Sequence, residues 1–127
     1  MKNVVRAADA EVYEAPEPYR RTLSILIDKT KGGAENIVMG LGELKPGSKS
    51  SAHSHENAEE VYWILKGKGF AIVGSEEYEI SPDVAIFVPK KTLHQVRCAG
   101  SQPLSWIWVM APASDVPESI RKLKRVR

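Results

Sequence analysis

Three histidines and one glutamate carry the clearest chemical signal in this sequence. His53 and His55 are separated by one residue, and Glu60 follows His55 by five positions. In an extended strand, two residues separated by one other share a face and lie roughly 6.6 Å apart. A turn over residues 56–58 would bring Glu60 back beside His55. His94 is the only other histidine in the chain.

Neutral imidazoles and a carboxylate together suit divalent transition metals, so these residues predict a site for Fe, Mn, Ni, Zn or Co. The predicted ligands are His53, His55, Glu60 and His94. Four protein ligands in an octahedral shell leave two positions for water, dioxygen or a chelating substrate. The residues alone leave a second interpretation open, in which a surface His-x-His pair and an unrelated core histidine share no function.

The same stretch resembles the first motif of the cupin superfamily. That motif consists of a glycine, five residues, His-x-His, three or four residues, a glutamate, six residues and a second glycine. Every position is matched here, by Gly47, His53, His55, Glu60 and Gly67.

The second cupin motif, which places a proline five residues before a histidine, is matched in part. Pro89 and His94 keep this spacing. Asp83 and Lys91 stand where the motif has glycines, and Cys98 stands where it has an asparagine. The resemblance covers the middle of the chain, and it implies a cupin fold with the two histidines of the first motif, its glutamate and His94 as metal ligands.

Short apolar segments separated by turn residues predict an all-β protein. Strands are expected over 22–28, 36–44, 61–65, 69–73, 78–80, 84–88, 93–98 and 103–110. Closely and regularly spaced short strands are typical of a sandwich or barrel, and a double-stranded β-helix (jelly-roll barrel) accommodates them. Gly40 and Gly42 lie within one predicted strand, where glycine indicates a bulge or the close approach of another element.

The 127 residues are expected to form one domain with three parts. Residues 1–21 form an extended arm, since Pro16 and Pro18 disfavour a helix or a central strand, and this arm can pair at a sheet edge. Residues 22–112 form the barrel, and residues 113–127 form a short basic helix that begins at a capping-box pattern, Asp115-x-x-Glu118. The five basic and no acidic residues in 121–127 favour a solvated helix end over nucleic-acid contact.

The composition excludes several classes of protein. No apolar run approaches the length of a membrane span, and no leader is apparent, so a cytoplasmic protein without membrane association is expected. The single cysteine, Cys98, cannot form an internal disulfide. No phosphate-binding glycine loop, nucleophile elbow or CxxC motif is present, and no cofactor besides the metal is expected.

Alternation along a strand assigns the neighbours of each ligand to a face. If Glu60 points into the barrel, Tyr62 does too, and Val61, Trp63 and Leu65 point outward. Such an apolar outer face requires a second sheet or another subunit. Cupins commonly dimerise, so the resemblance implies a homodimer with Trp63 near the contact. The alternative is that Trp63 packs under the N-terminal arm of its own chain.

The same reasoning directs Cys98 inward with His94. Cys98 has two interpretations, a redox-sensitive group near the metal or a small buried hydrophobe, and the second is favoured. Tyr62 is a candidate for proton transfer, although the sequence assigns it no partner. Trp106 and Trp108 either line the mouth of the pocket or fill the core, and the core is favoured because aromatic residues in barrels are more often core.

The sequence therefore predicts a metal-dependent enzyme acting on a small polar or oxyanionic molecule. Parity assigns no second carboxylate to the pocket, which favours chemistry at the metal, as in the small cupin dioxygenases that the chain resembles. Two alternatives are a non-catalytic cupin that binds or senses a small molecule through its metal and a metal-dependent sugar or keto-acid isomerase.

Overall fold

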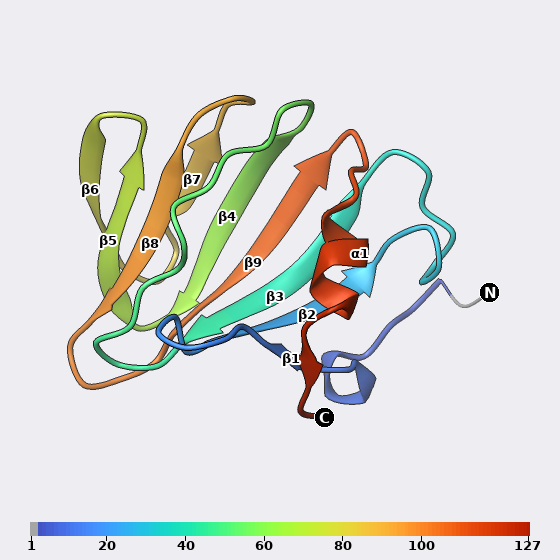
Figure 1. Cartoon of the computed structure of the whole chain (residues 1–127), viewed down its shortest axis with the longest axis horizontal. Helices are drawn as coiled ribbons and strands as arrows, with labels where there is room; N and C mark the ends of the chain where they lie inside the picture. The colour runs from blue at the N-terminus through green and yellow to red at the C-terminus, as the bar shows by residue number, and fades with distance from the viewer. Residues whose placement is uncertain (1–2) are drawn as a thin grey trace.

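The computed structural model describes residues 3–127, which fold into two antiparallel β-sheets with a short α-helix beside them (Figure 1). A 3₁₀ helix, η1 (Ala7–Asp9), precedes the sheets, and α1 (Val116–Arg121) follows them. The strands are β1 (Tyr13–Glu14), β2 (Arg21–Ile27), β3 (Val38–Leu44), β4 (Glu59–Lys66), β5 (Lys68–Val73), β6 (Glu76–Ile80), β7 (Ala85–Val88), β8 (His94–Ala99), β9 (Leu104–Ala111) and β10 (Lys124–Arg125).

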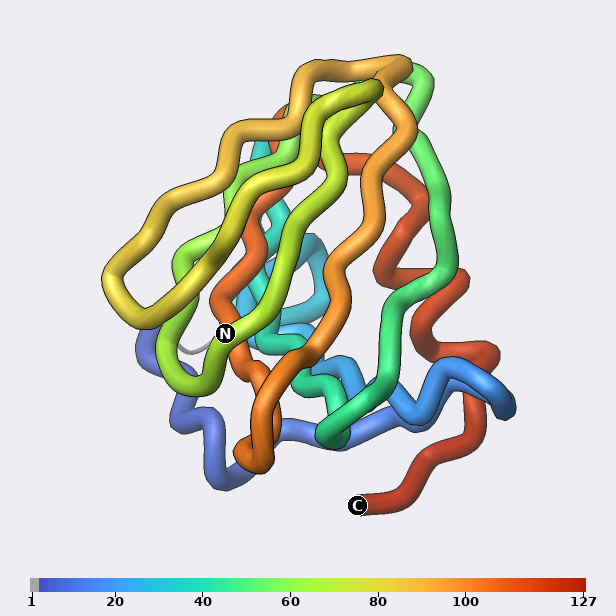
Figure 2. The backbone as a smooth tube through the Cα atoms, turned by 90° about the vertical axis from the view of Figure 1, so that its left-hand side faces the viewer, coloured from blue at the N-terminus to red at the C-terminus, as the bar shows by residue number. Residues whose placement is uncertain are grey.

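The two sheets differ in size and face one another across the hydrophobic core. The larger sheet has seven strands in the order β10-β1-β2-β3-β9-β4-β7, and the smaller has three in the order β6-β5-β8. Figure 2 shows the smaller sheet in front of the larger one. This arrangement confirms the predicted all-β jelly roll with a short C-terminal helix. None of the helices within residues 3–127 is long and apolar enough to cross a membrane.

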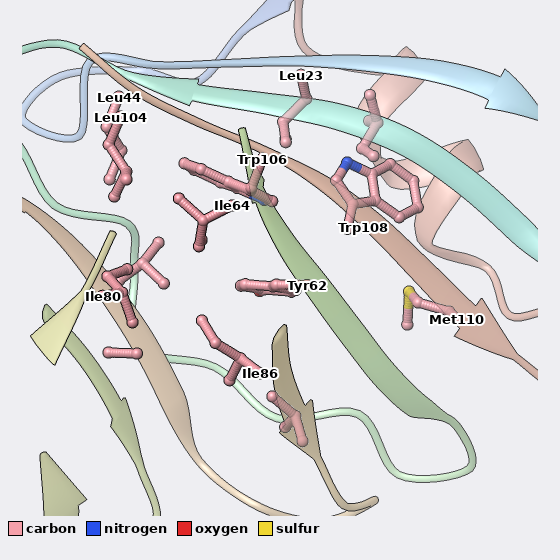
Figure 3. Packing of buried hydrophobic residues seen from close by; sticks show 14 of the residues in the cluster. Leu23, Leu44, Tyr62, Ile64, Ile80, Ile86, Leu104, Trp106, Trp108 and Met110 are labelled. Atoms are coloured by element: carbon pink, nitrogen blue, oxygen red, sulfur yellow. The ribbon is translucent and has the colours of Figure 1, made fainter. Parts of the chain in front are cut away.

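Alternate side chains of β4 point to opposite faces of the sheet, as predicted. Glu60, Tyr62 and Ile64 are buried, whereas Trp63 and its outward neighbours keep 40–42% of their surface exposed. In β8 the residues at positions 94, 96 and 98 are buried in the same alternating way. Figure 3 shows Tyr62, Ile64 and Trp106 pointing into the space between the sheets. The inward faces therefore supply both the core and the candidate ligands.

The two glycines of β3 allow the indole rings of β9 to lie against the sheet. Gly40 pairs with Trp108, and Gly42 pairs with Trp106. A Cβ atom at either glycine would overlap the opposite indole ring, and at Gly40 it would also overlap the carbonyl oxygen of Ser24. The predicted close approach is confirmed. Both tryptophans are buried in the core, at 2% and 3% exposure.

The segment that carries His53 and His55 is not the regular strand that its pattern predicts. Residues 45–58 form an extended loop alongside β8, joined to it by isolated bridges at Lys49↔Arg97 and His53↔His94. The Ser50 side chain accepts a hydrogen bond from the Val96 backbone N–H at 3.0 Å. Serine side chains compete with the backbone for such bonds, so a continuous ladder does not form.

The N-terminal arm pairs at a sheet edge, as expected. β1 lies between β2 and β10, with Tyr13 opposite both Leu23 and Arg125. The predicted helix over 113–127 is wrong in extent, because α1 ends at Arg121 and residues 124–125 form β10. The reason is the edge of β1: the Val126 N–H donates to the Val12 carbonyl at 2.8 Å, and the Val12 N–H donates to the Arg127 carbonyl at 2.9 Å, so this segment pairs with the edge instead of continuing the helix.

α1 packs against the barrel beside β2 (Figure 1). Ile120 is buried in the core, and Val116 and Leu123 pack against it, as predicted. Arg121 forms an ion pair of 2.8 Å with Asp28, a buried carboxylate. Burial opposes ionisation of Asp28, but the Lys31 backbone N–H and the Arg121 guanidinium outweigh it and hold the Asp28 pKa below its ordinary value.

The start of α1 differs from the predicted capping box. Asp115 precedes the helix but makes no side-chain cap hydrogen bond. The Ser114 hydroxyl instead accepts a hydrogen bond from the Val116 N–H at 3.3 Å. Asp115 is therefore available for a different role at this end of the barrel.

We expect Gly40→Ala to lower the free energy of unfolding by about 1–3 kcal/mol, because the new methyl group has no space between the Trp108 ring and the β2 backbone. Urea denaturation measures this loss, and near-UV circular dichroism should report a displaced indole. Gly100→Ala is the control for the indole signal only: its φ of +83° should make alanine costly there, but its surroundings are open, so no indole should be displaced. An unchanged indole signal in Gly40→Ala would contradict the packing argument.

Candidate metal centre

The structure brings the four predicted ligands together from three separate segments. His53 and His55 come from the loop beside β8, Glu60 from β4 and His94 from the start of β8. One potential ligand atom from each residue lies within 4.8 Å of the other three. Glu60 and His94 are buried, and the other two histidines are half-buried. The cluster therefore has a buried floor and a more open side.

The Glu60 carboxylate lies at the centre of the contacts. Its Oε1 is 3.2 Å from His55 Nε2 and 3.1 Å from His94 Nε2. The His53 ring lies 4.3 Å from the His94 ring and 5.0 Å from the His55 ring, measured between centroids. Three imidazoles and one carboxylate thus converge on one small volume.

Backbone carbonyls fix which ring nitrogen faces this volume. The Nδ1 of His53 lies 2.9 Å from the Ser51 carbonyl oxygen, and the Nδ1 of His94 lies 3.0 Å from the Thr92 carbonyl oxygen. A carbonyl can only accept, so each Nδ1 carries the proton, and in a neutral ring Nε2 keeps a lone pair. Nitrogen oriented in this way by an outer hydrogen bond is typical of metal-binding histidines.

The position of the proton on the His94 ring indicates that the cluster fits a cation. With its proton on Nδ1, neutral His94 directs the Nε2 lone pair at a Glu60 oxygen 3.1 Å away. Two lone pairs at this distance repel unless a proton or a metal ion lies between them. The residues present therefore fit a divalent metal.

The ionisation states favour the same interpretation. Burial opposes ionisation of Glu60, but the close contacts of its carboxylate with the His55 and His94 rings outweigh it and lower the Glu60 pKa to about 2. Burial, followed by the charge of His94, lowers the His53 pKa to about 4. At neutral pH the centre therefore contains an anionic carboxylate and a neutral His53 imidazole, which are the forms that bind metals.

The cluster forms one wall of a cavity of about 420 Å³. Cavities of this order accommodate small organic molecules. The cavity lies between the inner face of the larger sheet and α1. Ile120 of α1 and Leu123, just beyond the end of the helix, contribute to its lining. The remaining lining residues are Arg21, Leu23, Ser51, His53, Ser54, His55, Glu60, Tyr62, Trp106, Trp108, Asp115, Val116 and Ser119.

Tyr62 joins the metal-binding cluster to the aromatic wall of the cavity. Its ring stacks on Trp106 with centroids 5.9 Å apart and meets His94 edge-on at 6.2 Å. Burial, reinforced by the negative charge of Glu60, raises the Tyr62 pKa well above its ordinary value. Its phenol stays protonated at neutral pH, so it can donate a proton or a hydrogen bond but is not a base.

The other sequence candidate, Cys98, is buried but does not line this cavity. Its Sγ contacts the Gln102 carbonyl oxygen at 3.2 Å. The geometry favours the interpretation of Cys98 as a small buried hydrophobe. Trp106 and Trp108, in contrast, belong to the core and also line the cavity. Both interpretations, core filling and pocket lining, therefore apply to them.

Two charged residues of the cavity were missed by the sequence analysis. Arg21 was assigned to the N-terminal arm, whereas it is the first residue of β2. Residues 21, 23 and 25 of this strand alternate to the same face, and Leu23 and Ile25 are buried. This alternation was the signal that could have predicted an inward Arg21 side chain. Asp115, expected as a helix cap, lies exposed at the edge of the cavity. No local pattern indicates that position.

The sequence matches the cupin domain family over residues 40–110, more than half of the chain, and the protein therefore belongs to the cupins. This match confirms the family that the two motifs indicated.

Several known proteins are similar to this chain. An uncharacterised protein of Methanocaldococcus jannaschii, MJ1618, is 38% identical over 58 residues, 46% of each chain, so the match spans about half of that relative. The dimethylsulfoniopropionate lyase DddW of Ruegeria pomeroyi is 30% identical over 70% of this chain and 57% of its own. The solved structure of the polyketide cyclase RemF from Streptomyces resistomycificus superimposes with a TM-score of 0.76 at 24% identity, covering 100% of this chain and 87% of RemF.

We expect His55→Ala and Glu60→Gln to lower the metal content per chain several-fold, because the first removes a ligand and the second replaces an anionic carboxylate by a neutral amide, which is a weaker ligand. Elemental analysis of protein purified without an affinity tag measures the content, and circular dichroism checks that the β-fold is retained. Glu56→Gln is the matched control, since it removes an exposed carboxylate next to His55. Full metal retention in alanine variants of all four cluster residues would exclude this site.

Proposed function

We propose that this cupin is a metal-dependent enzyme with dioxygenase-like chemistry on a small polar or oxyanionic molecule. The observation that carries the proposal is the convergence of His53, His55, Glu60 and His94 on one wall of a cavity that can hold a small molecule. When bound there, a divalent transition metal would polarise a coordinated oxygen or, if redox-active, react with dioxygen.

The residues around the cluster would control substrate access and charge. The stacked rings of Tyr62 and Trp106 exclude water from one side of the cavity. The Glu60 carboxylate offsets one positive charge of a divalent ion. The Tyr62 phenol, protonated and in edge contact with His94, can donate to an oxygen atom of the substrate.

A second candidate is a non-redox reaction such as an isomerisation, elimination or cyclisation. Asp115 favours it, because this carboxylate at the cavity edge is the additional acid–base group that strand parity did not assign. The names of DddW, a lyase, and RemF, a cyclase, are compatible with it. A non-catalytic cupin that binds a small molecule through its metal is the remaining alternative.

Metal identity distinguishes these possibilities. We expect protein reconstituted with Fe or Mn to consume oxygen with a member of a library of small acids, keto compounds and catechols, and Zn-reconstituted protein not to do so. Oxygen electrode traces and product analysis measure this. Turnover that persists with Zn and is lost in Asp115→Asn would instead support the non-redox reaction.

A binding protein would behave differently from either enzyme. Its ligand would raise the melting temperature with Fe, Mn and Zn alike, without oxygen consumption or product, by the stabilisation RT ln(1 + [L]/Kd). This result would contradict the enzymatic proposal.

We further propose that the active form is a homodimer formed through the outer face of the larger sheet. Val61 pairs with Phe87 across β4 and β7, and these side chains are 42% and 55% exposed. Trp63 is 41% exposed, so the described part of the N-terminal arm does not cover it. Ile107, opposite Trp63 on β9, is only half-buried, although both faces of β9 were expected to be buried. A second copy of this apolar face fits all four side chains.

We expect Trp63→Glu to shift the sedimentation coefficient from that of a dimer to that of a single chain while the metal stays bound, because a charge at the centre of an apolar contact is costly to bury. Tyr78→Glu is the control, since Tyr78 is a similarly exposed aromatic residue on the smaller sheet. Wild-type protein that sediments as a monomer at micromolar concentration would contradict the dimer.

A further inference from the structure

The cavity contains one arginine without a partner. Among the side-chain hydrogen bonds and ion pairs within residues 3–127, none involves Arg21, and its Nε is buried and unpaired. Two arginines with more exposed side chains do form ion pairs: Arg97 pairs with Glu77 at 3.1 Å, and Arg121 pairs with Asp28 at 2.8 Å. Burial lowers the Arg21 pKa, and the Glu60 carboxylate opposes this effect through its charge but forms no ion pair with Arg21. Of these three cations, Arg21 is thus the one that makes no ion pair within the described part of the chain.

A second unpaired donor lines the same cavity. Trp108 Nε1 is buried and has no hydrogen-bond partner in the described chain, and with Arg21 Nε it makes up the full set of such side-chain atoms there. Figure 3 shows the Trp108 indole nitrogen within the core cluster beneath β3. Buried polar groups in native proteins are nearly always paired, so each exception needs a physical reason. Here both exceptions fall at one cavity.

An unpaired buried charge lowers the stability of the ligand-free protein. If the cavity presents this charge to an anionic ligand, the arginine gains its missing ion pair when the ligand binds. The guanidinium matches a carboxylate, because its parallel N–H groups donate to both oxygens. A single cation with the Asp115 carboxylate nearby at the cavity edge suits a monoanion better than a phosphate dianion.

We propose that Arg21 is the specificity-determining residue of the cavity and binds the carboxylate of a small substrate whose opposite, oxygen-bearing end faces the histidine cluster. This inference rests on the proposed metal site only for the opposite end of the substrate. The carboxylate preference itself follows from Arg21. The substrate class is a small carboxylic acid that also carries a chelating hydroxyl or keto oxygen.

The test compares two probes that differ only in charge. 3,4-Dihydroxybenzoate carries a chelating catechol and a separate carboxylate, and 3,4-dihydroxybenzamide replaces the carboxylate by a neutral amide. Calorimetric titration with Zn-loaded protein under argon avoids turnover. We expect wild-type protein to bind the acid about tenfold more tightly than the amide, the ratio that one charge-assisted pair provides.

Two variants distinguish direct recognition of the carboxylate by Arg21 from a nonspecific effect of the protein's net charge. Arg21→Gln should reduce the acid-to-amide ratio to about one while metal content and amide affinity stay within about twofold of wild type. Arg20→Gln removes the same charge from the adjacent exposed residue and should keep the wild-type ratio. Wild-type protein that binds the acid no more tightly than the amide, or binds neither, overturns the assignment, as does an unchanged ratio in Arg21→Gln.

A measurement without ligand distinguishes a binding role from a structural one. Arg21→Met removes the unpaired charge and should raise the melting temperature of the ligand-free protein by about 3 °C. A lower melting temperature would show that the guanidinium stabilises the fold and overturn the proposal. If the wild-type protein binds no metal, the proposed function fails separately, and the acid-to-amide comparison on metal-free protein still decides the role of Arg21.

Discussion

The pairing of the 45–58 loop with β8 is the constraint on which the site depends. His53 and His94 exchange two backbone hydrogen bonds, of 3.1 and 2.8 Å, across a gap of about forty positions in the chain. This bridge sets the two imidazoles side by side, and the carbonyls of Ser51 and Thr92, each two residues earlier, hold the Nδ1 atoms of both rings. The two ligands are thus oriented by equivalent local geometry on facing segments.

The alternation of β4 links this site to the surface of the protein. One face carries Glu60 to the histidines and Tyr62 to the aromatic wall, and the other face carries Trp63 outward. A shift of one residue in register would reverse all three positions. Because the ligand, the cavity wall and the proposed dimer contact are successive parts of one strand, a change that disturbs the strand should affect metal binding and association together.

The cavity exists because the larger sheet extends beyond the smaller one. Three strands cover part of its inner face, and α1, held by the ion pair of Arg121 with the buried Asp28, covers another part beside β2. The Gly40 and Gly42 positions let the indoles lie flat against β3. The space left between α1, the indoles and the histidines is lined by Arg21 and Asp115, whose charges give it a polarity that an apolar core lacks.

The sequence by itself determined the features that depend on short spacings. The His-x-His spacing, the glutamate five residues on, and the alternation in β4 and β8 place side chains through local backbone geometry, so the family, the fold class and the four clustered residues could be predicted. The alternation of Arg21 with Leu23 and Ile25 could have placed its side chain on the inner face. Only the tertiary structure decided that a cavity lies there, that Asp115 lies at its edge and that residues 124–125 form a strand instead of helix. These outcomes depend on contacts between β1 and β10 and between β2 and α1, which join segments about a hundred residues apart, and no local pattern encodes the free energy of such contacts.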